Sequence, residues 1–219
     1  MGAPRRSARS AVCAALLALG LHACARPPSA RSALRPILQP VATASLVGQV
    51  RIAGESDAVL RGVVFLENLA APAARSAPRV KLEHVRGRLV PSFSAAERGS
   101  ELSIVNRDAI YHAAFSLSQP ADFSFRAYAP GTHVGLRLDR PGVVRVYCRI
   151  HEGESATIFV APGSLARTSR DGHFAFRDVP AGRFMLGAWA DGAAGVRREI
   201  TLSAGERARH DLMLVPETD

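Results

Sequence analysis

The sequence predicts an all-β fold that consists of two β-sandwiches, and three observations support this fold class. Apolar residues alternate with polar ones in several segments, which is the period of a half-buried strand. Turn signals that contain Gly or Pro separate these segments, and no segment keeps a helical period. The 219 residues suit one large domain or two small ones, and the hydrophobic fraction of 47% excludes a wholly disordered chain.

Residues 1–23 have the parts of a secretory signal peptide: an arginine-rich head, an apolar stretch over residues 11–23 and a small residue before the expected cleavage site. The sequence Leu-His-Ala-Cys at residues 21–24 resembles the lipobox of bacterial lipoproteins, in which the cysteine becomes the lipidated first residue. We therefore predict lipidation of Cys24 and a membrane lipoprotein of the cell envelope that faces the periplasm. The alternative is an ordinary signal peptide and a soluble periplasmic protein, with Cys24 incidental.

Residues 24–45 are rich in Pro, Ala, Ser and Arg and show no steady apolar period, so we predict a flexible tether. The net charge of +9 does not indicate a nucleic-acid partner, because the arginines are scattered and no basic run is interleaved with aromatic residues. No apolar run reaches the roughly 18 residues that a membrane-spanning helix needs, which excludes a multi-pass membrane protein.

The strand patterns place a cysteine at the end of a half-buried strand. Val144, Val146, Cys148 and Ile150 share one face, while Arg145, Tyr147 and Arg149 share the other. Because the apolar face is the inward one, we expect Cys148 to point inward.

Two further strands are predicted nearby. One covers residues 133–138, and another contains Leu102 and Ile104. Residues 94–97 match a helix capping box, but Gly99 follows almost at once, so we predict a turn there.

Three side chains at two strand ends form a candidate metal site. Cys148 and His151 are spaced as C-x-x-H, and His112 follows the strand that contains Ile104. Two imidazoles and one thiolate are the strong ligands of a blue-copper centre. A structural zinc site usually has four Cys or His ligands, and a nucleophilic Cys–His pair would need an oriented base and an oxyanion hole, of which the sequence gives no sign.

Four motifs around these residues resemble those of a known family. They are N-R-D-A-I-Y-H (106–112), A-A-F-S-L-S (113–118), F-S-F-R-A-Y-A-P-G (123–131) and R-P-G-V-V-R-V-Y-C-R-I-H (140–151). In this order and at this spacing they are similar to the motifs of cupredoxins of the amicyanin and plastocyanin type, and in particular of methylamine utilisation protein-like proteins. The resemblance covers residues 79–162 and implies a Greek-key sandwich there.

The resemblance also implies a function. It implies one type 1-like copper ion bound by His112, Cys148 and His151, with Asn106 just outside the ligands. Such a protein carries single electrons to and from a redox partner protein and is not an enzyme, and the edge of His151 would be the electron exit. The alternative is a protein that stores or delivers copper, or a metal-free structural sandwich of the cell envelope.

The chain departs from the family pattern at two positions. Glu154 occupies the place of the axial Met, and Ala113 replaces an Asn that is expected to connect the two ligand loops by hydrogen bonds. Three interpretations of Glu154 are open: it is an axial ligand that favours Cu(II), it points to solvent, or the site binds copper poorly. The remaining histidines are interpreted as surface residues rather than ligands: His84, His133, His173 and His210.

A second sandwich is predicted around the copper domain. Residues 168–186 read T-S-R-D-G-H-F-A-F-R-D-V-P-A-G-R-F-M-L and resemble the carboxypeptidase regulatory-like (transthyretin-like) sandwich, whose opening strands occur here much earlier. We therefore predict a split sandwich of structural role, formed by residues 46–70 and 163–217 and interrupted by the copper domain. The alternative is that residues 46–70 pair with the copper domain.

Overall fold

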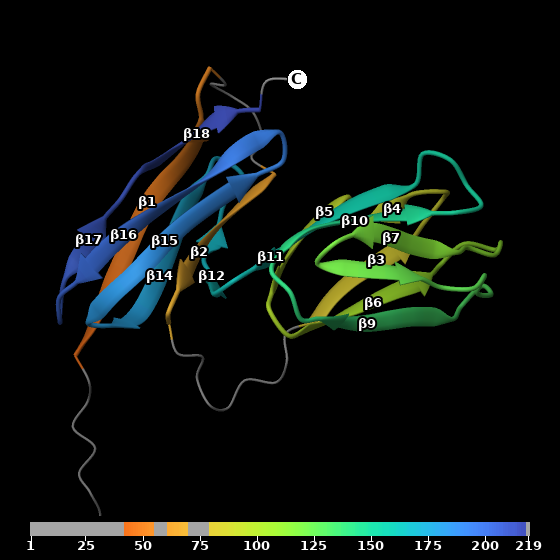
Figure 1. Cartoon of the computed structure of the whole chain (residues 1–219), viewed down its shortest axis with the longest axis horizontal. Coiled ribbons are helices and arrows are strands. Elements are labelled where there is room, and N and C mark those ends of the chain that lie inside the picture. The colour runs from red at the N-terminus through yellow and green to blue at the C-terminus, as the bar shows by residue number, and fades with distance from the viewer. Residues whose placement is uncertain (1–41, 55–60, 70–78, 218–219) are drawn as a thin grey trace, which may run out of the picture. The chain divides into compact units, whose positions relative to one another are not determined.

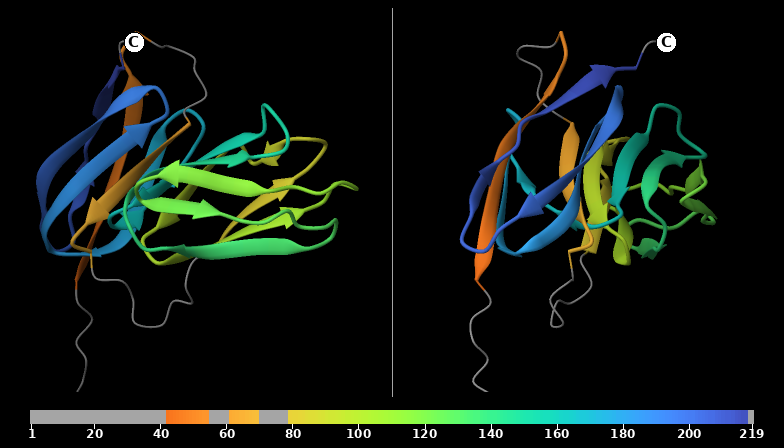
Figure 2. Two further views of the ribbon diagram at one scale, coloured as in Figure 1. Left: turned by 45° about the vertical axis from the view of Figure 1, so that its right-hand side comes forward. Right: turned by 60° about the vertical axis from the view of Figure 1, so that its left-hand side comes forward.

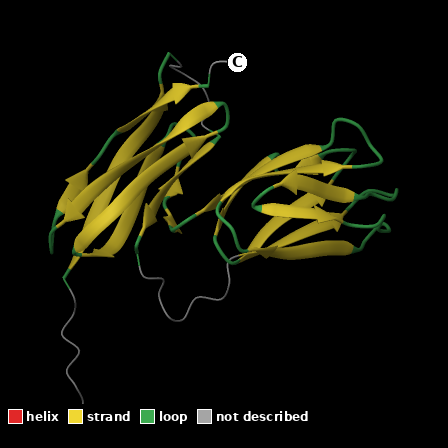
Figure 3. Cartoon of the chain, viewed as in Figure 1, coloured by secondary structure: helices red, strands yellow, loops and turns green. Residues whose placement is uncertain are grey.

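A computed structural model of the chain describes residues 42–54, 61–69 and 79–217 (Figure 1). All regular secondary structure within these ranges is β-strand, as Figure 3 shows, so the predicted all-β class is confirmed. No helix of this part of the chain is long and apolar enough to cross a membrane. The predicted signal peptide, Cys24 and the predicted tether up to residue 41 lie outside the described residues. The predicted end of the tether at residue 45 is wrong, because a strand begins at Thr43.

The strands between residues 79 and 161 form two sheets that enclose an apolar core. The five-stranded sheet has the order β5 (Phe93–Glu97), β11 (Ser155–Ala161), β10 (Gly142–Cys148), β7 (Ala114–Ser118) and β8 (Ala121–Ser124). The four-stranded sheet has the order β4 (Leu89–Val90), β3 (Arg79–His84), β6 (Ser100–Asn106) and β9 (His133–Leu138). The fully buried side chains between them include Leu82, Ile104, Leu138, Val146 and Ile158.

The alternation predicted for β10 is present. Val144, Val146 and Cys148 are buried, whereas Arg145 and Tyr147 are exposed. The inward position predicted for Ile150 is wrong, because β10 ends at Cys148 and Ile150 is 48% exposed in the loop that follows. The same inward face therefore carries the cysteine sulfur to the end of the strand.

The turn predicted over residues 94–97 is wrong, because these residues belong to β5. β5 pairs in parallel with β11 from Phe93 opposite Thr157 to Glu97 opposite Ala161. The turn comes only afterwards, at Gly99, whose φ is 87°. Pairing with a strand some 60 residues away decides the conformation here, and a short local motif does not contain that information.

The remaining strands form a nine-stranded sheet that combines both ends of the described chain. Its order is β12 (Ser164–Leu165), β2 (Gly62–Glu67), β15 (Gly182–Ala190), β16 (Ala193–Leu202), β18 (Leu212–Pro216), β1 (Thr43–Ile52), β14 (His173–Pro180) and β13 (Arg167–Thr168), and β17 (Arg207–Arg209) pairs with β1. Figure 2 shows β1 and β2, in orange, among the blue C-terminal strands. These pairings are the ones that a split sandwich of residues 46–70 and 163–217 requires; the domain division itself stays a prediction.

One glycine of the predicted opening strand is required by a close backbone approach. Gly48 lies in β1 opposite Phe174 of β14. A Cβ atom at this position would come within 1.8 Å of the carbonyl oxygen of His210, so that only glycine fits. The core beside it consists of side chains from both ends of the described chain, among them Leu46, Leu66, Phe176, Leu186 and Leu202.

Candidate metal centre

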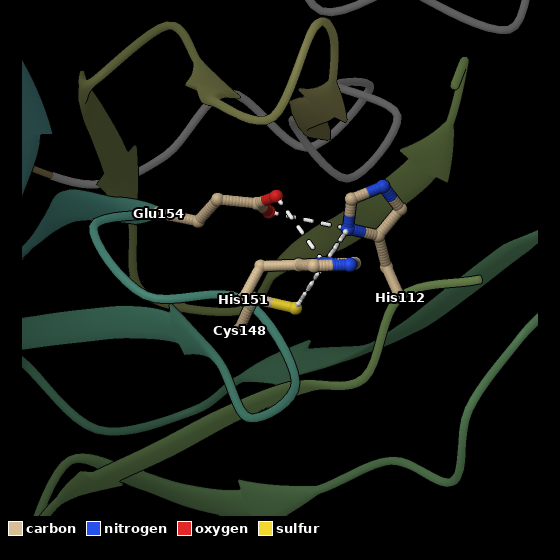
Figure 4. A group of neighbouring side chains, drawn as sticks. All are labelled: His112, Cys148, His151 and Glu154. Atoms are coloured by element: carbon tan, nitrogen blue, oxygen red, sulfur yellow. Dashed lines mark hydrogen bonds and ion pairs between the residues drawn. The ribbon is translucent and has the colours of Figure 1, made fainter. Parts of the chain in front are cut away.

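The predicted ligands converge at one end of the sandwich. His112, Cys148, His151 and Glu154 point toward one another (Figure 4), and their ligand atoms all lie within 4.8 Å of one another. Cys148 ends β10, Glu154 directly precedes β11, and His151 lies in the loop between these strands. His112 comes shortly before β7, which pairs with β10 through Cys148 and Ala114.

The spacing of the donor atoms suits a single ion. The Cys148 sulfur lies 3.7 Å from Nδ1 of His112 and 3.6 Å from Nδ1 of His151, and the two Nδ1 atoms are 3.2 Å apart. Ligand atoms about 2.0–2.3 Å from one tetrahedral ion are separated by roughly 3.3–3.8 Å. The three predicted strong ligands therefore have the separations that a shared ion requires.

Glu154 is buried, which contradicts the interpretation that it points to solvent. The residue is 2% exposed. Its Oε2 lies 3.2 Å from Nδ1 of His112, and its Oε1 lies 3.5 Å from Nδ1 of His151. The carboxylate therefore faces both imidazoles and stands in reach of the same point as the other three donors.

The orientation of His112 is fixed from its outer side by Asp108. Nε2 of His112 lies 3.2 Å from Oδ2 of Asp108, and the same carboxylate accepts hydrogen bonds from the backbone N–H groups of Arg86 and Gly87. A carboxylate partner holds the proton on Nε2, which leaves the lone pair of Nδ1 directed at the other donors.

Asn106 is connected to the candidate site through Asp108. It is fully buried, and its Nδ2 donates to the carbonyl oxygens of Ile110 and Tyr128 at 2.7 and 3.2 Å. Its Oδ1 accepts from the N–H of Asp108 at 3.0 Å. Asn106 thus fixes the turn that carries both Asp108 and His112.

Backbone hydrogen bonds connect the two loops that carry the candidate ligands, although Ala113 has no side-chain amide. The N–H of Arg149 donates to the carbonyl oxygen of Ala113 at 2.9 Å. The N–H of Cys148 donates to the carbonyl oxygen of Glu154 at 3.2 Å, which closes the ligand loop on itself. The loops are therefore connected through main-chain atoms that any residue would supply.

His84 was predicted to lie on the surface, and that prediction is wrong. Its side chain is fully buried at the end of β3 and stacks on His112, with ring centroids 3.9 Å apart. Its Nδ1 lies 2.6 Å from Oε2 of Glu154, and its Nε2 lies 2.6 Å from the hydroxyl of Tyr128. Burial lowers the pKa of His84 to about 4, so the imidazole is neutral at neutral pH.

The buried polar atoms of this cluster are suited to a cation. Burial raises the pKa of the Glu154 carboxyl and lowers the pKa of His112. The Oε1 atom of Glu154 is buried and has no hydrogen-bond partner. An orphaned oxygen beside two imidazole nitrogens and a sulfur is costly unless a positive charge satisfies it. The donor set of one sulfur, two nitrogens and one oxygen fits copper.

The comparisons with known proteins give limited similarity. No protein-family model and no curated protein matches the sequence. Similar solved structures include a purple cupredoxin from Nitrosopumilus maritimus, at 16% identity over 37% of this chain and 99% of that one with a TM-score of 0.34. A copper(I) amicyanin variant matches at 13% identity over 45% of this chain and 98% of that one, with a TM-score of 0.35.

A copper-containing nitrite reductase from Thermus scotoductus SA-01 also matches, at 17% identity and a TM-score of 0.36, over 51% of this chain and 28% of that one. What the described residues define by themselves is an all-β protein with a buried cluster of one thiol, two imidazoles and one carboxyl group that can hold a metal ion. The function is therefore argued from that cluster.

Proposed function

We propose that this chain is an exported, cupredoxin-like protein that binds one type 1-like copper ion and carries single electrons. His112, Cys148 and His151 would be the strong ligands, and Glu154 would be the axial ligand. The chain would act as an electron carrier rather than as a multi-copper oxidase, since one ligand cluster is found among the described residues.

The observation that carries the proposal is the set of four convergent donors with one unsatisfied oxygen. The donors come from a rigid hairpin end and a neighbouring turn, and three of the four residues are buried. Thiolate and imidazole are the ligands that both redox states of copper accept, and a hydrogen-bonded β-scaffold limits ligand movement when the charge changes.

Each residue has a defined part in this function. When bound, copper supplies one-electron chemistry. Asp108 holds the ring of His112, the β10–β11 hairpin holds Cys148, and the side chain of His151 is 32% exposed. His151 therefore offers the partly exposed edge through which an electron could leave toward a partner.

The cellular setting is part of the proposal. We infer from residues 1–24 that the protein is exported and held at the periplasmic side of a membrane by a lipid on Cys24. The segment from Cys24 to the start of β1 at Thr43 would allow the folded part to reach a redox partner protein. Cys148 is the only cysteine after Cys24, which leaves a single thiol for the metal.

Copper loading of residues 42–219 tests the proposal. Addition of Cu(II) is expected to give an intense visible band from thiolate-to-copper charge transfer, and Cys148→Ser is expected to abolish that band. The matched control is His133→Ala, which changes an exposed histidine of β9 and should leave the spectrum unchanged. A wild-type protein without such a band, or a band that survives Cys148→Ser, contradicts the proposed function.

A further inference from the structure

Three buried polar side chains form a continuous line behind the proposed ligands. The hydroxyl of Tyr128, the ring of His84 and the carboxylate of Glu154 are connected by two contacts of 2.6 Å each. All three side chains are buried, and they come from separate parts of the chain: β3, the segment before β9 and the loop before β11. Such a line is assembled only by the tertiary fold.

The line has one consistent direction of donation when Glu154 is ionised. A neutral imidazole has a single N–H, so Nδ1 of His84 donates to Oε2 of Glu154 while Nε2 accepts from the hydroxyl of Tyr128. Both ring nitrogens are then satisfied, and His84 has no lone pair left for a metal. His84 therefore touches the site through Glu154 and through its stacking on His112.

The two oxygens of Glu154 are used differently. Oε2 lies 2.6 Å from Nδ1 of His84 and 3.2 Å from Nδ1 of His112, whereas Oε1 is buried, has no hydrogen-bond partner and faces Nδ1 of His151 at 3.5 Å. A carboxylate fixed through one oxygen and free at the other is how proteins orient an oxygen ligand, because the outer partner fixes the rotamer and raises the basicity.

We propose that Tyr128 and His84 are positioning residues that hold Glu154 as an anionic oxygen ligand, so that the site favours Cu(II) over Cu(I). This inference rests on the proposed copper function. An oxygen ligand is harder than a thioether and stabilises the more highly charged ion, whereas sulfur and imidazole alone hold Cu(I) well. A Glu154 side chain without His84 would be a buried carboxylate with both oxygens unsupported, and its rotamer would no longer be fixed.

The test compares the dissociation constants for Cu(II) and Cu(I), each measured by competition with a chelator of known affinity. His84→Leu is expected to weaken Cu(II) binding by about 10- to 100-fold, the usual cost of losing a hydrogen-bond partner of a metal ligand, and to leave Cu(I) binding within about threefold. His84→Gln is expected to restore most of the Cu(II) affinity, because its amide can donate to Glu154. His133→Ala serves as the control for removal of an exposed histidine.

A double-mutant cycle separates positioning from general damage. In a Glu154→Gln background, His84→Leu is expected to have no further effect on the ratio of the Cu(II) and Cu(I) constants, since the carboxylate that it positions is gone. If His84→Leu does not fold, the test uses Tyr128→Phe instead. This variant removes only the hydroxyl that donates to Nε2 of His84, and it should weaken Cu(II) binding several-fold more than Cu(I) binding.

The outcomes distinguish this inference from the function on which it rests. A wild-type protein that binds no copper overturns both. The positioning role alone is overturned if the wild-type protein shows the thiolate band but the ratio of the dissociation constants for Cu(II) and Cu(I) is unchanged in His84→Leu. Where His84→Leu is unfolded, the same ratio is compared in Tyr128→Phe. If His84→Leu changes the ratio of the Cu(II) and Cu(I) constants equally in the wild-type and Glu154→Gln backgrounds, His84 acts through packing and the positioning role is also overturned.

Discussion

Glu154 places a carboxyl group at the candidate metal centre, at the position where the sequence pattern that the chain resembles has a methionine. The residue is buried and faces both imidazoles of the site. Together with a thiolate at Cys148, its carboxylate would balance the two positive charges of Cu(II), whereas Cu(I) would leave an excess negative charge in a poorly solvated place. The reduction potential should therefore be low for a site of this type.

Glu154→Met is expected to raise that potential. Each tenfold change in the preference for one redox state corresponds to 59 mV for a one-electron couple, so loss of a 10- to 100-fold preference for Cu(II) gives a rise of about 60–120 mV. A redox titration followed at the visible band measures the shift. Glu152→Met, an exposed change in the same loop, is the control and should leave the potential in place. An unchanged potential in Glu154→Met would show that this side chain does not touch the metal.

The members of the candidate metal centre could be singled out at the residue scale, and one of the residues that contacts them could not. The donor types and the order of the motifs identify His112, Cys148 and His151 without coordinates. His84 has no motif, and a lone histidine in a polar segment gives no metal signal. Its position does carry a weak signal, because Val80, Leu82 and His84 alternate along β3 and all three are buried. That period places His84 in the core, but its contact with Glu154 depends on how the sheets meet.

At the scale of elements, the conformation of the loop between β6 and β7 depends on hydrogen bonds made by Asn106. Its side-chain amide donates to the carbonyl oxygens of Ile110 and Tyr128 and accepts a hydrogen bond from the N–H of Asp108. Asp108 in turn orients His112, so the geometry of a ligand follows from an amide at the end of the preceding strand. The loop therefore forms one rigid piece with the end of β6.

Asn106→Ala is expected to destabilise the loop between β6 and β7. Loss of the amide removes three hydrogen bonds to backbone groups, one of them buried and two part-buried, which costs about 1–3 kcal/mol in the free energy of unfolding. Copper affinity should also fall by roughly 10- to 100-fold, because His112 is no longer held. Urea denaturation of the metal-free protein and chelator competition measure the two effects. Ser103→Ala, a half-buried change in the same strand, should stay within about 0.5 kcal/mol, and an equal effect of both variants would contradict the assigned role.

Elements with a clear two-residue period were predictable, and those decided by distant pairing were not. The inward face of β10 follows from alternation alone, which is why Cys148 could be placed. β5 contains a local helix-capping pattern but becomes a strand because it pairs with β11 along its whole length. Local motifs describe the free energy of the isolated segment, and the hydrogen bonds and burial gained from the partner strand outweigh it here.

For the whole molecule, the chain leaves one sheet and returns to it. β1 and β2 belong to the nine-stranded sheet, whereas residues 79–161 lie in two other sheets before β12 resumes the first. The motif over residues 168–186 predicted the returning strands, because its missing opening strands had to come from elsewhere. The detailed order of nine strands could not be predicted, since several registers satisfy the same alternation.

Deletion of residues 46–70 is expected to unfold the strands that follow residue 163. Loss of β1 separates β14 and β13 from β18, and loss of β2 separates β12 from β15. The core also loses Leu46, Val50, Val64 and Leu66, which are at most 2% exposed. Burial of each such side chain contributes about 1.5–3 kcal/mol, so their sum is comparable with the whole stability of a domain, about 5–15 kcal/mol.

Trp189, the single tryptophan, lies on β15 opposite Val63 of β2 and reports the change by fluorescence. A solvent-exposed emission spectrum without a cooperative urea transition is the expected result, and a native-like Trp189 signal in the deleted protein would show that residues 46–70 do not complete this sheet.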